Sequence, residues 1–383
     1  MNLGRNNYPE IREAVADLCK TFGSAYWQDV DEKRAYPEAF VDALTKAGWM
    51  SALIPEQYGG SGLSLTEASV IMEEVTRSGG NAGCCHGQMY NMNTLLRNGS
   101  QKQKELYLPK IARGELRLQA MGVTEPGAGT DTTKIKTVAV KKGDRYVVNG
   151  QKVWTSRLQH SDLMILLART TPIDQVKKKS EGLSIFLVDT KSKGLEVRPI
   201  RNMVNHETNQ VFIDNLEIPA EHLIGEEGRG FRYILDGLNA ERILIAAECI
   251  GDGYWFTEKS TKYANDRVVF DRPIGQNQGI QFPIAESYME IEAANLMRYK
   301  AAALFDEKKP CGAEANMAKH LAAKASWEAG NVCLQTHGGF GFAAEYDVER
   351  KFRETRLYLV APISTNLILS HLAEHVLGLP RSF

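Results

Sequence analysis

The sequence predicts an α+β protein with a helical part, a β part and a second helical part, in that order along its 383 residues. Apolar residues recur at helical spacing in the first and last thirds of the chain, whereas short apolar runs of strand length occupy the middle. The strand-like runs follow one another without helices between them, which favours an antiparallel sheet or barrel over a βαβ nucleotide-binding fold. We expect domains over residues 1–118, 119–225 and 226–383.

The first part contains three segments with helical periodicity. Pro9–Cys19 has apolar residues three and four positions apart, and Pro37–Gly48 and Leu65–Ser78 repeat this pattern. Glycines stand where the last two segments end, as is typical of helix ends. The loop Gln57–Gly62 separates these two segments. This part is therefore expected to be an all-helical domain.

The middle part carries strand and turn signals. Tyr146–Val148 leads into Asn149–Gly150, a residue pair typical of a two-residue hairpin turn. Later runs are rich in aliphatic residues and have the length of strands. These runs are Leu163–Ala168, Leu183–Asp189, Gln210–Ile213 and Leu216–Ile218.

The last part returns to long helical patterns. Phe231–Ala264 is the longest, and Gly251–Gly253 predicts an interruption in it. Gln278–Glu307, Glu314–Gly338 and Ser364–Val376 follow. Consecutive long helices joined by short connections predict a four-helix bundle.

Composition narrows the class of protein. Apolar residues make up 43% of the chain, charged residues 24%, and the formal net charge is −1, which is ordinary for a globular protein and suggests neither nucleic acid nor membrane as partner. The six cysteines form no C-x-x-C pair, so we expect reduced thiols and no metal site. The N-terminal segment lacks a signal-peptide core, which favours a cytoplasmic location, or the mitochondrial matrix for the mature form of a eukaryotic protein.

Two segments of the middle part can carry chemistry. Met121–Asp131 reads MGVTEPGAGTD, a glycine-rich turn whose backbone N–H groups can approach a ligand closely. Val153–Ser156 reads VWTS and offers an aromatic ring and hydroxyls that can hydrogen-bond. Each segment also has a plain structural interpretation, a surface turn for the first and a strand with Trp154 in the core for the second.

Together these motifs resemble the flavin site of the acyl-CoA dehydrogenase family. Two later segments, DRVVFDRPIG at Asp266–Gly275 and CLQTHGGFGF at Cys333–Phe342, extend the resemblance over nearly all of the chain. The resemblance implies FAD as cofactor. It places the backbone of Val123 and the side chain of Thr124 at the flavin, and Thr130 nearer the CoA arm.

The resemblance also assigns roles to residues in the other motifs. Trp154 would stack on the flavin and Ser156, where the family more often has threonine, would lie near the hydride-accepting N5. Arg267 and Phe270 would bind the flavin pyrophosphate of a neighbouring subunit, although Asp271 replaces the family's usual glycine. Further cofactor contacts are assigned to Met121, Arg242, Gln335, Gly338, Gly339, Ser364 and Asn366, and substrate contacts to Thr130, Tyr90, Asn239 and Arg242.

The family's usual catalytic glutamate is missing. Its E-G-T motif falls on Pro362, Ile363 and Ser364, none of which can take a proton from carbon. A minority of the family places the glutamate on the long helix that opens the C-terminal domain, and the matching residue is Glu241 in LNAERILIAA. Glu241 is therefore the predicted base. The alternative is a glutamate that is exposed or paired with an arginine from another helix.

The resemblance implies dehydrogenation of an acyl-CoA at Cα–Cβ, with electrons passed to an electron-transfer flavoprotein and a homotetrameric assembly. Two other functions stay open on the same fold. The first is a flavin-dependent monooxygenase or oxidase, since several relatives of that kind lack the usual glutamate. The second is a catalytically inactive flavin-binding paralogue.

Overall fold

The structure is a computed structural model that describes residues 7–382, apart from the side chain of Asp236. The chain forms two compact units that interleave along the sequence. One, here called the helical unit, comprises residues 1–37, 64–83 and 239–383, and the other, the sheet unit, comprises residues 38–63 and 84–238.

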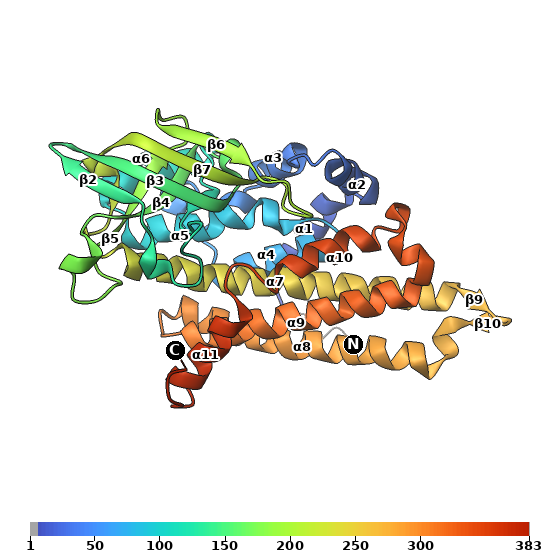
Figure 1. Ribbon diagram of the computed structural model, residues 1–383. Coiled ribbons are helices and arrows are strands. Elements are labelled where there is room, and N and C mark those ends of the chain that lie inside the picture. The colour runs from blue at the N-terminus through green and yellow to red at the C-terminus, as the bar shows by residue number, and fades with distance from the viewer. Residues whose placement is uncertain (1–6, 383) are drawn as a thin grey trace. The chain divides into compact units, whose positions relative to one another are not determined.

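The sheet unit holds eight strands in the order β6-β7-β3-β2-β4-β5-β8, with β1 also paired to β4 (Figure 1). Most neighbouring strands are antiparallel, as predicted, but β1 and β2 both run parallel to β4. A parallel neighbour needs a longer connection than a hairpin, and β1 is reached from a helix. The strands are β1 Ala120–Gly122, β2 Val138–Lys142, β3 Arg145–Ser156, β4 Leu163–Arg169, β5 Leu183–Asp189, β6 Leu195–Pro199, β7 Thr208–Pro219 and β8 Leu223–Ile224.

The hairpin predicted at Asn149–Gly150 is wrong. Strand β3 passes through both residues, and the turn lies at Gly143–Asp144, where Lys142 pairs with Arg145. Gly150 instead marks a shift in the register of β3 against β7, at a place where a Cβ would lie 2.4 Å from Thr137 Oγ1. The glycine thus serves a close approach within the sheet and not a turn.

The apolar run of β4 is buried on both faces. Ile165 and Leu167 pack with helices α5 (His86–Asn98) and α6 (Gln101–Ala112), whereas Met164 and Leu166 pack with residues of β3 and β7. A strand covered on both faces has no reason to alternate apolar and polar residues. This is why Leu163–Ala168 is apolar throughout. Helix α3 (Glu38–Lys46) is also part of the sheet unit.

The helical unit contains the remaining long helices and one small hairpin. The predicted helices are confirmed, with ends that differ by a few residues. The helices are α1 Pro9–Lys20, α2 Ser24–Glu32, α4 Leu65–Arg77, α7 Gly230–Asp266, α8 Gln278–Asp306, α9 Gly312–His337, α10 Val348–Leu357 and α11 Thr365–His375, and the hairpin strands are β9 Val268–Val269 and β10 Arg272–Pro273. Helix α7 begins in the sheet unit and continues into the helical unit from Asn239.

The interruption predicted at Gly251–Gly253 is wrong, because α7 runs on through both glycines. A Cβ at position 251 would lie 2.0 Å from Thr76 Oγ1 and 2.3 Å from the Glu73 carbonyl oxygen. A Cβ at position 253 would lie 2.7 Å from Ile291. The glycines therefore let α4 and α8 approach α7, and tertiary packing outweighs their low helix propensity.

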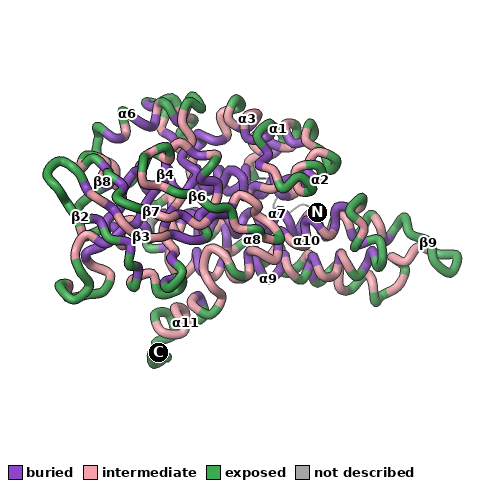
Figure 2. The backbone as a smooth tube through the Cα atoms, turned by 45° about the horizontal axis from the view of Figure 1, so that its top comes forward, coloured by how far each residue is buried: buried purple, intermediate pink, exposed green. Residues whose placement is uncertain are grey.

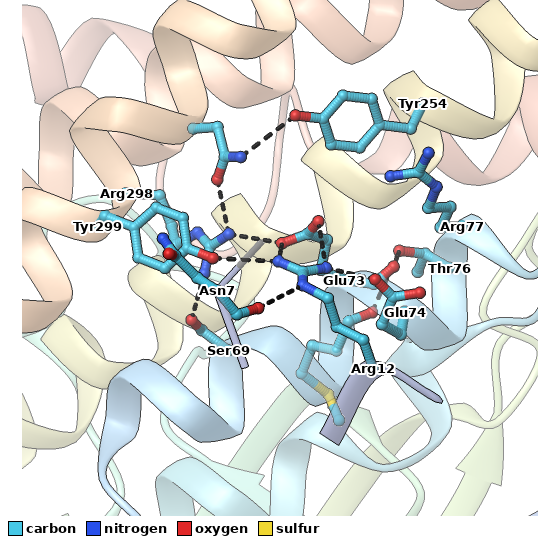
Figure 3. Close-up of polar contacts among 12 residues, drawn as sticks. Asn7, Arg12, Ser69, Glu73, Glu74, Thr76, Arg77, Tyr254, Arg298 and Tyr299 are labelled. Carbon is cyan, nitrogen blue, oxygen red and sulfur yellow. Dashed lines mark hydrogen bonds and ion pairs between the residues drawn. The ribbon is translucent and has the colours of Figure 1, made fainter. Parts of the chain in front are cut away.

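A buried polar network joins α1, α4 and α8 (Figure 3). Arg12 donates to both carboxylate oxygens of Glu73, at 2.8 and 3.1 Å, and also contacts Glu74. Arg298 donates to the same Glu73 carboxylate at 2.5 Å and to Ser69 Oγ at 2.8 Å. With two arginines facing two glutamates, these charges are paired, which is the condition for burying them.

Exposed apolar side chains lie on the surface of the helical unit, and Phe270 is one of them. The β9–β10 hairpin is exposed (Figure 2), and Phe270 in its turn is 94% exposed. Within residues 7–382, no helix is long and apolar enough to cross a membrane. All six cysteines are buried and unbridged.

Candidate functional site

The glycine-rich segment Val123–Asp131 forms a compact turn directly after β1. Glu125 and Ala128 exchange backbone hydrogen bonds of 3.2 and 3.0 Å across it. The Val153 N–H donates to the Thr124 carbonyl at 2.9 Å and so ties the turn to β3. Among the described residues, no atom outside the chain neighbours lies within 4 Å of a Cβ built on Gly127. The turn therefore offers open space beside its backbone, as close approach to a ligand requires.

A buried ion pair supports this turn from beneath. Lys152 Nζ lies 2.9 Å from Glu125 Oε1 and donates to the Val123 carbonyl at 3.0 Å. The Glu125 carboxylate also accepts the backbone N–H groups of Lys136 at 2.6 Å and Thr137 at 2.9 Å. The pair thus fixes both ends of the turn. Sequence reasoning missed it, and the available signal was a lysine inside an otherwise strand-like segment next to the motif.

The two charges of this pair affect each other's protonation. Burial lowers the pKa of Lys152 to about 8, although the Glu125 carboxylate acts in the opposite direction. Burial alone would raise the pKa of Glu125, but the charge of Lys152 and the hydrogen bonds from Thr137 and Lys136 lower it overall. Glu125 is therefore a carboxylate at neutral pH, and a charged Lys152 is its partner.

Trp154 and Ser156 stand at the end of β3, just beyond the turn. Trp154 is 58% exposed and has a left-handed backbone with φ of 61°. Ser156 Oγ accepts from Asn205 Nδ2 at 2.9 Å and lies 3.3 Å from Thr208 Oγ1. The alternative interpretation, in which Trp154 lies in the core, is wrong. A large indole exposed beside an open glycine turn fits a flat aromatic ring such as a flavin.

The helical unit positions a second group of predicted residues on α7. Glu241 is only 5% exposed and opens a buried apolar stretch of the helix. Arg242 is 9% exposed, and its Nη1 donates to Asn239 Oδ1 at 2.8 Å. Burial lowers the pKa of Arg242, and the Glu241 carboxylate acts against that shift, so the two charges interact. The interpretation of Glu241 as an exposed residue is wrong.

The segment Ala361–Ser364, where the family's usual glutamate would stand, contains no acid. The Ala361–Pro362 peptide is cis. The Ile363 carbonyl accepts from Lys319 Nζ at 3.0 Å, and Ser364 Oγ caps α11 by accepting the Leu367 N–H at 3.3 Å. Asn366 is exposed in the first turn of α11. Lys319 was not predicted. It is 1% exposed, and burial lowers its pKa to about 8.

Two motifs of the helical unit lie close together, Asp266–Gly275 after α7 and Cys333–Phe342 at the end of α9. Arg267 follows the last residue of α7, and its guanidinium lies 5.7 Å from the Phe340 ring centroid. Gln335 is exposed, and within the described part of the chain no atom apart from the chain neighbours lies within 4 Å of a Cβ built on Gly338 or Gly339. The structure therefore unites an arginine with an open glycine loop, a combination that suits phosphate binding.

The predicted site residues divide between the two units. The sheet unit brings together the glycine turn and the end of β3, while Tyr90 lies buried on α5. The helical unit holds the α7 residues, the Ala361–Ser364 segment and the Arg267 region. The sheet-unit set is Tyr90, Met121, Val123, Thr124, Thr130, Trp154 and Ser156, and the helical-unit set is Asn239, Glu241, Arg242, Arg267, Phe270, Gln335, Gly338, Gly339, Ser364 and Asn366.

Comparison with protein families covers nearly the whole chain. Models of the N-terminal, middle and C-terminal domains of acyl-CoA dehydrogenase match residues 7–115, 120–216 and 228–377. Acyl-CoA dehydrogenase fadE12 of Mycobacterium bovis is 34% identical over 378 residues, covering 97% of this chain and 96% of that protein. Caffeyl-CoA reductase-Etf complex subunit CarC of Acetobacterium woodii is 32% identical over 356 residues, 91% of this chain and 93% of that one.

Comparison of structures agrees. The structure of the glutaryl-coenzyme A dehydrogenase complex with glutaryl-CoA superposes with a TM-score of 0.92 at 29% identity, covering 100% of this chain and 98% of that one. The three domain matches, the relatives and this structure all indicate one family, and the open turn beside Trp154 fits its flavin. The chain therefore belongs to the acyl-CoA dehydrogenase family, whose members are FAD-dependent oxidoreductases.

Proposed function

We propose that the protein dehydrogenates an acyl-CoA thioester at Cα–Cβ, with Glu241 as the base that removes the α-proton. One observation carries the proposal. The Glu241 carboxylate is 5% exposed on α7, whereas Ala361–Ser364 offers no acid. Placing a carboxylate in such a buried position costs free energy, so its presence at a family position for the base supports a catalytic role.

The chemistry requires a base of this kind. The α-proton of a thioester is a weak acid, so its removal needs a positioned proton acceptor. Arg242 keeps a positive charge next to Glu241, and Asn239 orients the guanidinium through the 2.8 Å hydrogen bond. We assign Arg242 and Asn239 to the positioning of the carboxylate and of the substrate around it.

The bound cofactor supplies the other half of the reaction, because FAD accepts the β-hydride. In the sheet unit, Trp154 would stack on the flavin, and the backbone of Val123 with the Thr124 side chain would contact its polar edge. Because Asn205 donates to Ser156 Oγ, Ser156 keeps its own O–H to donate to Thr208 or to the flavin. Thr130, which is exposed at the end of the turn, would lie toward the CoA arm.

The proposal includes an electron-transfer flavoprotein as acceptor and a homotetramer. The first is supported by the likeness to a subunit of a caffeyl-CoA reductase-Etf complex. The second is supported by the exposed hairpin, since Phe270, three residues after Arg267, is 94% exposed and suits contact with another subunit. In such an assembly Arg267 and Phe270 would bind the pyrophosphate of the neighbour's flavin, and Gln335, Gly338 and Gly339 its adenine half.

The test is anaerobic mixing of the FAD-loaded protein with a panel of acyl-CoA thioesters, followed by flavin absorbance. We expect one class of thioester to bleach the flavin. Glu241→Gln should retain FAD and bind the thioester while its reduction rate falls by about 10²- to 10⁴-fold. The matched control is Glu258→Gln, the same substitution on the same helix at a half-exposed side chain paired with Arg77; its rate should stay near the wild-type value.

A near-normal rate of flavin reduction in Glu241→Gln would show that Glu241 is not the base. If no thioester bleaches the flavin of the wild-type protein, the dehydrogenase proposal fails. Oxygen consumption with reduced flavin would then identify an oxidase or monooxygenase. Its absence would indicate a flavin-binding protein without turnover.

A further inference from the structure

The first ten residues of helix α5 combine burial with polar side chains. All of the residues from His86 to Leu95 are buried, and five of them are polar. A helix in such a position normally has apolar residues on all sides. The polar side chains of α5 therefore need partners inside the protein, because a buried polar group without one is costly.

Two of these polar residues bond to parts of the sheet unit outside α5. Gln88 Nε2 donates to the Met50 carbonyl at 3.0 Å, and Gln88 Oε1 accepts the Leu118 N–H at 3.3 Å. Arg157 Nη2 donates to His86 Nε2 at 3.3 Å. These bonds attach the first turn of α5 to the segments before β1 and after β3.

Asn91 differs from its neighbours. It is 0% exposed, and within the described part of the chain neither its Oδ1 nor its Nδ2 has a hydrogen-bond partner. Asn93, which is 8% exposed, likewise has no partner for Nδ2 among those residues. A whole amide buried without partners is exceptional in folded proteins and indicates an acceptor and a donor supplied by something else.

The position of Asn91 indicates what that partner is. Gly87 lies one turn earlier on the same face of α5, where a Cβ would stand 2.6 Å from the Gln119 carbonyl and 3.0 Å from Arg157 Nη2. Gln119 precedes β1, which leads into the glycine turn, and Arg157 follows Ser156 on the strand that carries Trp154. The unpartnered amide is therefore on the face of α5 that packs against both flavin-facing segments.

We propose that Asn91 is a specificity-determining residue that recognises an oxygen-bearing substituent on the acyl group of the substrate. This inference rests on the proposed dehydrogenation, because it assumes an acyl chain next to the flavin and Tyr90. A hydroxyl complements the amide fully, since it accepts from Nδ2 and donates to Oδ1. A plain alkyl chain would leave the amide without partners, which is how a polar subsite rejects it.

The experiment compares matched pairs of thioesters. Butyryl-, valeryl- and hexanoyl-CoA are each measured beside their ω-hydroxy counterparts with wild-type protein, Asn91→Leu and Asn98→Leu. Asn98 is the control because it ends the same helix and its amide already donates to the Thr94 carbonyl at 3.3 Å. Rates of flavin reduction give kcat/KM, and spectral titration of the Glu241→Gln background gives Kd without turnover.

In at least one pair we expect the wild-type protein to prefer the hydroxylated thioester by about tenfold, and Asn91→Leu to abolish or reverse that preference. Asn98→Leu should leave the ratio unchanged. A wild-type preference for the alkyl member of every pair, or an unchanged ratio in Asn91→Leu, would overturn the inference. If no thioester reduces the flavin, dehydrogenation fails, but the Kd ratios still decide whether Asn91 recognises oxygen.

Discussion

Lys152 in the sheet unit and Lys319 in the helical unit have similar burial but different partners. Their exposed fractions are 0% and 1%, and burial lowers the pKa of each to about 8. Lys152 faces the Glu125 carboxylate at 2.9 Å, whereas the hydrogen bond of Lys319 goes to the uncharged Ile363 carbonyl at 3.0 Å. The Glu241 carboxylate opposes this lowering of the Lys319 pKa, whereas the positive charge of Arg242 adds to it.

The difference shows that burial alone does not determine what a lysine contributes. Removing Lys152 would leave a buried carboxylate without its counter-charge, under the turn that we propose faces the flavin. Removing Lys319 would leave only a carbonyl without a donor, at the segment where the family's usual glutamate is missing. We therefore expect substitutions of the two lysines to change the free energy of unfolding by different amounts and with different pH dependence.

The largest effect is expected for Lys152→Met. Removing one partner of a buried ion pair typically lowers the free energy of unfolding by about 3–5 kcal/mol. Because the pair supports the glycine turn, we also expect the variant to bind FAD more weakly. Urea unfolding and the FAD content of the purified protein measure the two effects. Lys142→Met is the control, because this lysine is exposed at the end of β2 in the same sheet. Equal stability of the two variants would show that the pair does not support the turn.

Some of this site could be predicted from the sequence and some could not. The turn Val123–Asp131 was recognisable because its residues are contiguous and each glycine follows from a local need for close approach. The pair of Lys152 with Glu125 was not, because it joins positions 27 residues apart and depends on how β3 lies beneath the turn. Lys319 and Ile363, 44 residues apart, were missed for the same reason.

The errors in the predicted fold were made at glycines. Asn149–Gly150 and Gly251–Gly253 were predicted as a hairpin turn and a helix break, yet both lie inside regular elements. In each case the missing Cβ admits another part of the chain, Thr137 beside Gly150 and helix α4 beside Gly251. A glycine signals close approach or a turn equally well, and only the tertiary structure distinguishes the two.

The second-largest effect is the pH dependence of the stability that Lys319 contributes. Since Lys319 has a pKa of about 8 when folded and the ordinary value of 10.5 when unfolded, the unfolded chain binds more protons between these values. The contribution of Lys319 to the free energy of unfolding therefore rises with pH across this window, by up to about 3 kcal/mol. The difference in unfolding free energy between the wild-type protein and Lys319→Met should grow by that amount.

Urea titrations from pH 7 to pH 10.5 would follow this difference. The control is Lys324→Met, an exposed lysine on the same helix α9, whose difference from the wild-type protein should not change with pH. Other groups that titrate in this range, including Lys152, are present in every variant and largely cancel. A constant difference for Lys319→Met would mean that the pKa of Lys319 is the same in the folded and unfolded states.

A third, smaller effect distinguishes the contribution of charge from that of hydrogen bonding in the Lys152–Glu125 pair. In Glu125→Gln combined with Lys152→Met, the glutamine carbonyl can still accept one of the two N–H groups that Lys136 and Thr137 donate to the two Glu125 oxygens, and no charge is left buried. We expect the double variant to recover about 1–2 kcal/mol of the stability lost in Lys152→Met. Denaturant unfolding of both variants and of Glu125→Gln completes the double-mutant cycle. A double variant as unstable as Lys152→Met would show that packing, and not charge, determines the loss.

The smallest effect is expected for Lys319→Gln at pH 7. A glutamine side chain can still donate to the Ile363 carbonyl, and it carries no charge that burial would penalise, so the change in unfolding free energy should stay below about 1 kcal/mol. Its effect on catalysis separates two roles of Lys319. If Lys319 only holds the Ala361–Ser364 segment, the pH profile of flavin reduction will match the wild-type profile. If its charge also acts on Glu241, loss of that charge will move the acidic limb of the profile to higher pH, because a carboxylate without a nearby cation binds its proton more tightly.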